Sequence, residues 1–154
     1  MQRLPEKLSL DQGAIEPLSV AMHASDRAAL PAGSTVLVLG AGAVGLLCAA
    51  MAKATGAKTV VIADIQKDRV DFALAHGFAD AGVLVPMARP ATTETKLEYA
   101  REVAASVKGT DVGGGVVGEV DAVFECTGVE TCLQTAIYVS LNPLLLLAYK
   151  IILQ

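Results

Sequence analysis

Residues 36–47 read VLVLGAGAVGLL, an aliphatic run that breaks at a glycine-rich bend and continues into helix-forming residues. The run 35–39 is β-branched and aliphatic and has the length of a strand, which predicts a strand buried on both faces. Residues 43–55 are good helix formers, and the glycine that follows them is typical of a helix C-terminus. The stretch therefore predicts a strand, a glycine bend and a helix.

The bend itself, GAGAVG at residues 40–45, fits the pattern G-x-G-x-x-G. Gly40 permits a tight turn, Gly42 lets a pyrophosphate approach the backbone, and Gly45 lets the helix pack closely against the sheet. The free N–H groups and the positive dipole end of the helix would then bind the phosphates. The pattern, in this strand-to-helix context, indicates a dinucleotide site.

A carboxylate supports this interpretation. Asp64 directly follows a second predicted strand at residues 59–63 and lies 19 positions after Gly45. There it can accept both hydroxyls of an adenosine ribose, and it would repel a 2′-phosphate, which favours NAD over NADP. Arg69 lies within reach of the same ribose. The alternatives are a helix N-cap for Asp64 and a solvated surface charge for Arg69.

The rest of the chain alternates between strands and helices, which implies a parallel sheet covered on both faces. We predict an α/β fold: a Rossmann-type doubly wound parallel sheet that is incomplete, with about four of six strands. Further expected strands cover residues 81–85 and 120–124, and expected helices cover 15–29, 67–76, 95–108 and 130–139.

Two of these helices carry an expected inner face. A capping box at Thr95 and Glu98 should open the helix that ends at Gly109. The residues expected to point inward are Val70, Ala73 and Leu74 in the helix at 67–76, and Leu97, Ala100, Ala104 and Val107 in the helix at 95–108.

Composition excludes several classes of function. The chain of 154 residues is 53% hydrophobic and 18% charged, with a net charge of −4 and no basic cluster, so neither nucleic acid nor an anionic membrane is an expected partner. The three cysteines lack C-x-x-C spacing and are expected to be buried free thiols. No secretory leader is visible, and the apolar run 144–153 is too short to cross a bilayer, so we expect a soluble cytoplasmic protein.

Two other cofactors are disfavoured. S-adenosylmethionine sites usually carry an acid just before the first glycine, where this chain has Leu39. A flavin dinucleotide bend normally lies close to the chain start.

Three segments resemble a known family: IEPLSVAMHAS (15–25), residues 36–73 from the first strand to the helix after Asp64, and FECTGVE (124–130). They are similar to the zinc-containing medium-chain alcohol dehydrogenases, in the sorbitol and xylitol (polyol) dehydrogenase branch. The resemblance implies NAD-dependent oxidation of a polyol to a ketose, with one catalytic zinc.

The resemblance also implies roles for single residues. Val44 would pack beside the cofactor, and residues 126–128 would line the nucleotide cleft. Glu16 matches an acidic residue beside the catalytic zinc that contacts the metal or its water and the polyol, although a Glu at a helix entry more often complements the helix dipole. The cofactor-binding residues that we expect are Gly40, Gly42, Ala43, Val44, Gly45, Asp64, Arg69, Cys126, Thr127 and Gly128.

The chain also departs from the family. The family's catalytic domain precedes the bend and supplies a Cys, a His and a Glu, whereas no cysteine precedes Cys48 here. His23 is expected to take a core or interhelical role rather than to ligate a metal. A catalytic zinc needs three protein ligands, so Glu16 alone cannot hold it and the metal site is incomplete.

We therefore divide the chain into a remnant of the catalytic-domain junction with a helix (1–30), a truncated NAD-binding Rossmann domain (31–140) and an atypical apolar tail (141–154). We interpret the tail as a frame change or unspliced segment of the gene, the alternative being a strand or helix at the sheet edge.

The predicted function is the NAD-binding portion of a polyol dehydrogenase-like oxidoreductase that is catalytically incompetent alone. The alternative is a non-catalytic NAD-binding or subunit-interaction module, forming a homo-oligomer or pairing with an intact subunit through its incomplete sheet edge.

Overall fold

The computed structural model describes residue 9 and residues 13–140. The expected apolar tail at 141–154 lies outside the described residues, as does most of the segment that precedes the first helix.

Within the described residues, four parallel strands form one sheet in the order β3-β2-β1-β4. They are β1 (Thr35–Leu39), β2 (Thr59–Asp64), β3 (Ala81–Leu84) and β4 (Ala122–Glu125). The chain passes outward from β1 to β3 and then returns to the other side of β1 to form β4, so the winding direction reverses beside β1. A crevice at such a reversal, beyond the carboxyl ends of the strands, is where ligands bind in sheets of this kind.

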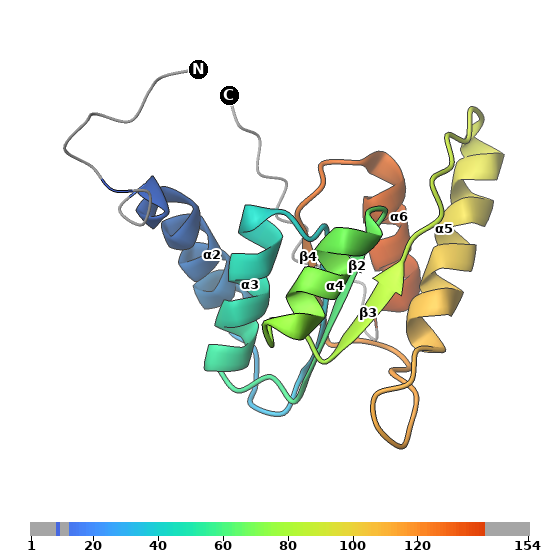
Figure 1. Ribbon diagram of the computed structural model, residues 1–154. Coiled ribbons are helices and arrows are strands. Elements are labelled where there is room, and N and C mark those ends of the chain that lie inside the picture. The colour runs from blue at the N-terminus through green and yellow to red at the C-terminus, as the bar shows by residue number, and fades with distance from the viewer. Residues whose placement is uncertain (1–8, 10–12, 141–154) are drawn as a thin grey trace.

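Helices cover both faces of the sheet (Figure 1). One layer contains α2 (Ile15–Ala28), α3 (Ala43–Ala54) and α4 (Lys67–Ala75), and the other contains α5 (Thr93–Lys108) and α6 (Glu130–Val139). This arrangement confirms the predicted α/β fold with a doubly wound parallel sheet.

Alternate residues of β1 supply the two cores. Val36 and Val38 pack into the cluster with α2, α3 and α4, whereas Leu37 and Leu39 pack into the cluster with α5 and α6. All four are at most 2% exposed. Burial on both faces explains why the strand is an unbroken aliphatic run.

The start of α5 differs from the expectation. Thr92, not Thr95, is the N-cap: its extended backbone lets the side chain accept a hydrogen bond from Thr95 N, and the Thr95 hydroxyl reaches back to Thr92 N. The capping box is thus Thr92 with Thr95, three residues earlier than predicted. Of the expected stripe, Leu97 is only half-buried, and Val103 takes a buried place that the prediction missed.

Two side chains lie further out than expected. Leu74 faces β3 as predicted, with Cδ1 3.1 Å from the place of a Cβ on Gly82, but it is 38% exposed because β3 is the edge strand; Val70 lies nearer to Gly82. His23 is exposed on α2, so a core role for it is wrong; the residues by which α2 is buried are Ala21, Ala24, Ser25 and Ala28.

None of the helices in the described part of the chain combines the length and apolar character needed to cross a membrane.

Candidate functional site

The glycine bend begins where β1 ends. Gly40 has φ +100°, a conformation that favours glycine, and its N–H donates to Ala63 O at 2.7 Å. A Cβ on Gly40 would lie 2.9 Å from Thr127 Cγ2, so the bend also needs glycine because the loop after β4 packs against it.

Gly42 is the N-cap of α3 and leaves the N-terminal end of the helix, here called the helix mouth, open. Within the described chain no side chain caps this helix, and a Cβ built on Gly42 would meet no heavy atom within 4 Å. The first N–H groups of α3 therefore face a space that an anion could enter.

Gly45 has a different role, on the inner side of the same helix. A Cβ at Gly45 would lie 1.8 Å from Gly40 O and 3.4 Å from Val38 Cγ1. The absence of a side chain there is what lets α3 pack directly on the bend, as the sequence predicted.

Asp64 joins the bend to the turn that follows β2. Its Oδ2 accepts from Ala41 N at 2.7 Å, and its Oδ1 accepts from Gln66 N at 2.8 Å. The side chain is 7% exposed, and Arg69 Nη1 lies 3.9 Å from Oδ2. The N-cap of α4 is Gln66, so the alternative role of Asp64 as that N-cap is wrong. Each carboxylate oxygen keeps a further lone pair for a ligand hydroxyl.

Glu125 organises the loop after β4 in a similar way. Its Oε1 accepts from Thr127 N at 2.7 Å, from the Thr127 hydroxyl and from Gly128 N at 3.1 Å, and the residue is 3% exposed. Sequence reasoning missed Glu125. The available signal was its place as the last strand residue before Cys126-Thr127-Gly128.

These elements open onto one cavity of about 470 Å³, within the usual size of ligand pockets. It lies at the carboxyl ends of β1, β2 and β4. The structure brings six of the expected cofactor-binding residues into its wall: Gly40, Gly42, Asp64, Arg69, Cys126 and Thr127. The expected residues that do not line it are Ala43, Val44, Gly45 and Gly128.

The far wall of the cavity was not anticipated from the sequence. It includes residues 85–89 after β3, Tyr99 and Val103 of α5, and Cys132 of α6. The Tyr99 hydroxyl donates to Pro86 O at 2.6 Å, which ties the loop after β3 to α5. Burial raises the pKa of Tyr99, and the nearby Cys132 raises it further. The Tyr99 hydroxyl therefore keeps its proton and stays a hydrogen-bond donor.

Two thiols also line the cavity. All three cysteines are free; Cys48 is buried, whereas Cys126 and Cys132 are half-buried, so full burial was correct only for Cys48. A hydrogen bond with Cys48 and burial raise the pKa of Cys126, and burial raises the pKa of Cys132 with help from the charges of Glu125 and Asp64. Both cavity thiols are therefore held in the protonated form.

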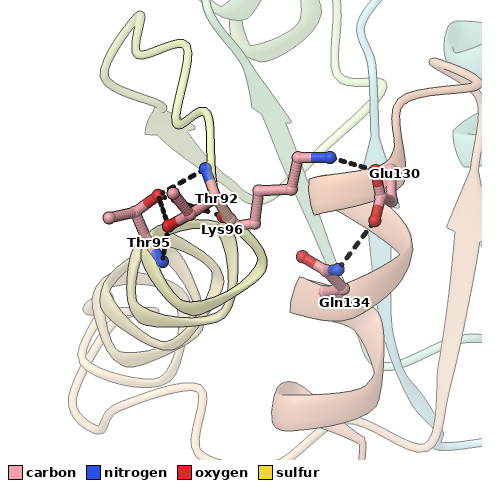
Figure 2. Close-up of polar contacts among 5 residues, drawn as sticks. All are labelled: Thr92, Thr95, Lys96, Glu130 and Gln134. Atoms are coloured by element: carbon pink, nitrogen blue, oxygen red, sulfur yellow. Dashed lines mark hydrogen bonds and ion pairs between the residues drawn. The ribbon is translucent and has the colours of Figure 1, made fainter.

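The helices behind the far wall are joined by a polar bridge (Figure 2). Lys96 Nζ of α5 lies 2.6 Å from Glu130 Oε2 of α6, and Gln134 Nε2 donates to Glu130 Oε1 at 3.3 Å. The bridge leaves from the first turn of α5, beside the Thr92 and Thr95 cap.

Glu16 lies apart from the cavity. It is exposed in the first turn of α2, a place where a carboxylate complements the helix dipole. Across residues 13–140, no group of three His, Cys, Asp or Glu side chains is placed to hold a metal ion.

Comparisons with known proteins agree with the fold. The family model described as "FAD binding domain" matches residues 35–111, the segment from β1 to α5. "Probable D-xylulose reductase A" of Emericella nidulans is 43% identical over 89% of this chain and 34% of the relative, and D-xylulose reductase A of Aspergillus niger is 41% identical over 89% and 35%. The chain spans about a third of the length of the curated relatives it matches.

Two solved structures extend the comparison. A protein of Sinorhizobium meliloti described as a zinc-binding dehydrogenase, with NADP bound, is 32% identical and superposes with a TM-score of 0.60 over 80% of this chain and 32% of its own. Galactitol-1-phosphate dehydrogenase of Escherichia coli is 26% identical with a TM-score of 0.54, over 89% of this chain and 35% of its own.

Proposed function

We propose that this chain is the NAD-binding portion of a polyol dehydrogenase-like oxidoreductase of the zinc-containing medium-chain alcohol dehydrogenase family, the family to which its relatives and structural neighbours point. The observation that carries the proposal is the open helix mouth at Gly42 beside the buried carboxylate of Asp64, both in the wall of one cavity.

The residues present fit the ADP half of a dinucleotide. The amides that follow Gly42 would take the pyrophosphate, because no described side chain caps them and no Cβ fills the approach. Asp64 would accept from the adenosine ribose with its remaining lone pairs. The part of the cavity between Tyr99 and Cys132 would receive the adenine, since apolar walls favour a flat aromatic ring.

The same geometry favours NAD over NADP. A 2′-phosphate would lie against the Asp64 carboxylate, and two like charges in a poorly hydrated site repel each other. Arg69 offsets part of this repulsion from 3.9 Å. We therefore propose a preference for NAD that depends on Asp64.

The family match to an FAD-binding model makes FAD the second candidate, because FAD and NAD share the ADP half that the bend and Asp64 would hold. A flavin ligand would keep the same contacts at residues 40–42 and differ beyond the pyrophosphate. The two candidates are separated by direct binding measurements.

The oxidation of a polyol is the reaction suggested by the names of the longer relatives. NAD supplies an acceptor for the hydride that leaves the carbinol carbon of a polyol, the substrate class suggested by the relatives' names. The described residues do not bring together the ligands of a catalytic zinc, so no metal-assisted step is assigned to them. The role proposed for these residues is to bind and orient the cofactor.

Isothermal titration calorimetry with NAD, NADP and FAD tests the proposal. We expect NAD to bind more tightly than NADP by about tenfold or more, a difference of about 1.4 kcal/mol. Asp64→Asn should reduce that preference, because the negative charge next to the ribose is gone.

Asp121 offers a matched control. Its Oδ2 accepts from Thr35 N at 2.7 Å, so it also holds the backbone of β1, but at the opposite end of the strand from the cavity. Asp121→Asn should leave both affinities unchanged. Failure of all three dinucleotides to bind at millimolar concentration would contradict the proposal, and tighter binding of FAD than of NAD would replace NAD by FAD.

A further inference from the structure

Glu125 is a buried acid that the proposed cofactor contacts do not use. It is 3% exposed, and its carboxylate accepts four hydrogen bonds: from Thr127 N, the Thr127 hydroxyl and, with each of its oxygens, Gly128 N. We propose that Glu125 is a positioning residue for the dinucleotide: it holds the turn at Thr127–Gly128 as the wall of the site that faces the glycine bend. This inference rests on the proposed function.

The turn and the bend are in direct contact. Glu125 pairs with Leu39 in the sheet, and Cys126 N donates to Leu39 O at 2.9 Å, so both loops leave neighbouring strands at the same level. A Cβ on Gly40 would lie 2.9 Å from Thr127 Cγ2. A displacement of Thr127 would therefore change the space beside Gly40 where the ligand has to lie.

A carboxylate suits this task better than a neutral side chain. Three donors of the turn converge on Oε1, and Gly128 N is shared with Oε2; an ionised carboxylate accepts at both oxygens and brings no competing donor hydrogen. Bonds to an ionised acceptor are stronger than neutral ones, which offsets the cost of burying the charge. Gly128 has φ +72°, a left-handed backbone conformation that favours glycine. The hydrogen bonds to Glu125 stabilise the turn in this conformation.

The charge of Glu125 also reaches the cavity thiols. The pKa of Cys126 is raised chiefly by a hydrogen bond with Cys48 and by burial, with a smaller contribution from Glu125. The pKa of Cys132 is raised chiefly by burial, a hydrogen bond with Thr127 lowers it, and the charge of Glu125 raises it further. The ionisation of Cys132 therefore depends on whether the Glu125 carboxylate lies beside the turn.

The first test uses a matched pair of glycines. Gly128 and Gly113 have φ +72° and +81°, and a Cβ on either would meet no heavy atom of the described chain within 4 Å. Alanine should cost similar folding free energy at both positions, about 1 kcal/mol, because only the backbone conformation is strained. Only Gly128 belongs to the turn, so Gly128→Ala should weaken NAD binding by about tenfold, whereas Gly113→Ala should leave it within about twofold.

The second test replaces the acid itself. Glu125→Ala removes every acceptor from the turn and should weaken NAD binding by about tenfold or more. Glu125→Gln keeps an acceptor oxygen for Thr127 and should restore binding to within about threefold of the wild type. Circular dichroism verifies that each variant is folded. If Glu125→Ala does not fold, the comparison of Gly128→Ala with Gly113→Ala tests the inference instead.

A third readout separates positioning by the charged group from a loss of packing. Iodoacetamide labelling of Cys132, followed across pH by peptide mass spectrometry, should show a lower midpoint in Glu125→Gln than in the wild type, because a negative charge that disfavours the thiolate is gone. An unchanged or higher midpoint would mean that the Glu125 carboxylate does not lie beside the turn, which overturns the inference.

The outcomes distinguish this inference from the proposed function. If the wild type binds NAD and both Gly128→Ala and Glu125→Ala bind it equally well, the inference is wrong and the proposed function stands. If the wild type binds no dinucleotide, the proposed function fails and this inference fails with it.

Discussion

Gly42 and Gly45 belong to one motif, yet the surrounding atoms give them separate roles. Gly42 faces open space at the helix mouth, whereas Gly45 packs against the carbonyl oxygen of Gly40. Gly42 also has φ −76°, which alanine adopts without strain. The requirement for glycine at Gly45 therefore comes from the fold, whereas at Gly42 the proposed function assigns the requirement to the ligand.

We predict opposite effects for alanine at these two positions. Gly42→Ala should change the free energy of unfolding by no more than about 0.5 kcal/mol but remove most NAD binding, because the new methyl group fills the phosphate approach. Gly45→Ala should lower the free energy of unfolding by about 2 kcal/mol or more, because α3 must move off the bend. Urea denaturation followed by circular dichroism, together with calorimetry, measures both. Equal losses of stability in the two variants would contradict the assignment.

At the residue scale, the sequence allowed the prediction of groups tied to a motif by spacing. Asp64 was found because a second strand places an acid one strand away from the bend, and the structure puts it in the cavity wall. Glu125 was missed because its function depends on three donors in its own loop, and no spacing rule reports such local hydrogen bonds. Leu74 was predicted on the correct face but is only partly buried, because helical periodicity does not reveal that α4 covers the edge of the sheet.

At the scale of elements, α5 and α6 together form the far wall of the cavity. The bridge between Lys96 and Glu130 is prominent in Figure 2, but the Glu130 side chain is 61% exposed, and water screens such pairs. Val107 of α5, by contrast, is fully buried in the cluster shared with Ala136 and Val139 of α6. Apolar packing therefore holds these helices together more strongly than the ion pair does.

We predict that Lys96→Met lowers the free energy of unfolding by less than about 1 kcal/mol. Val107→Ala should lower it by about 2 kcal/mol, because it removes two buried carbons and leaves a cavity. Denaturant unfolding of both variants provides the comparison. A larger loss in Lys96→Met than in Val107→Ala would show that the ion pair dominates.

Element boundaries show how far local sequence signals extend. The predicted bounds of the strand at 35–39 and of the helix at 130–139 match the structure at both ends. In both segments the sequence pattern is unbroken, so it indicates a single start and a single end. The start of α5 was misassigned because Thr95 and Glu98 fit the sequence pattern of a capping box, whereas the box that forms pairs Thr92 with Thr95, a pair outside that pattern. The extended backbone at Thr92 decides between them.

At the scale of the whole molecule, alternation of strands and helices was enough to predict the sheet and its layers, because parallel strands need crossovers that cover both faces. The cavity could be predicted only in part. Its near wall follows from the bend and Asp64, whereas its far wall arises where residues 85–89 meet α5 and α6, contacts between segments that share no sequence pattern. The role expected for Glu16 stays a prediction, since it lies outside the cavity wall.

We predict that this chain binds NAD without turning over a polyol. Purified chain with zinc, NAD and xylitol should produce no rise in the absorbance of the reduced cofactor, because the role proposed for residues 13–140 is to bind and orient the cofactor, and polarising a carbinol takes a catalytic zinc held by three protein ligands. A steady rise that a chelator abolishes would contradict this prediction and assign catalysis to the chain. A matched reaction without polyol is the control.

The central claim is that backbone amides at the N-terminal end of α3 donate hydrogen bonds to the phosphates of a dinucleotide. The most direct test is a nuclear magnetic resonance titration of the ¹⁵N-labelled chain with NAD, which follows each amide separately. The amides of Gly42, Ala43 and Val44 should shift progressively and saturate together, while that of Gly113 stays in place. If those three amides do not move while NAD is bound, or if saturation is never approached at millimolar NAD, the claim is wrong.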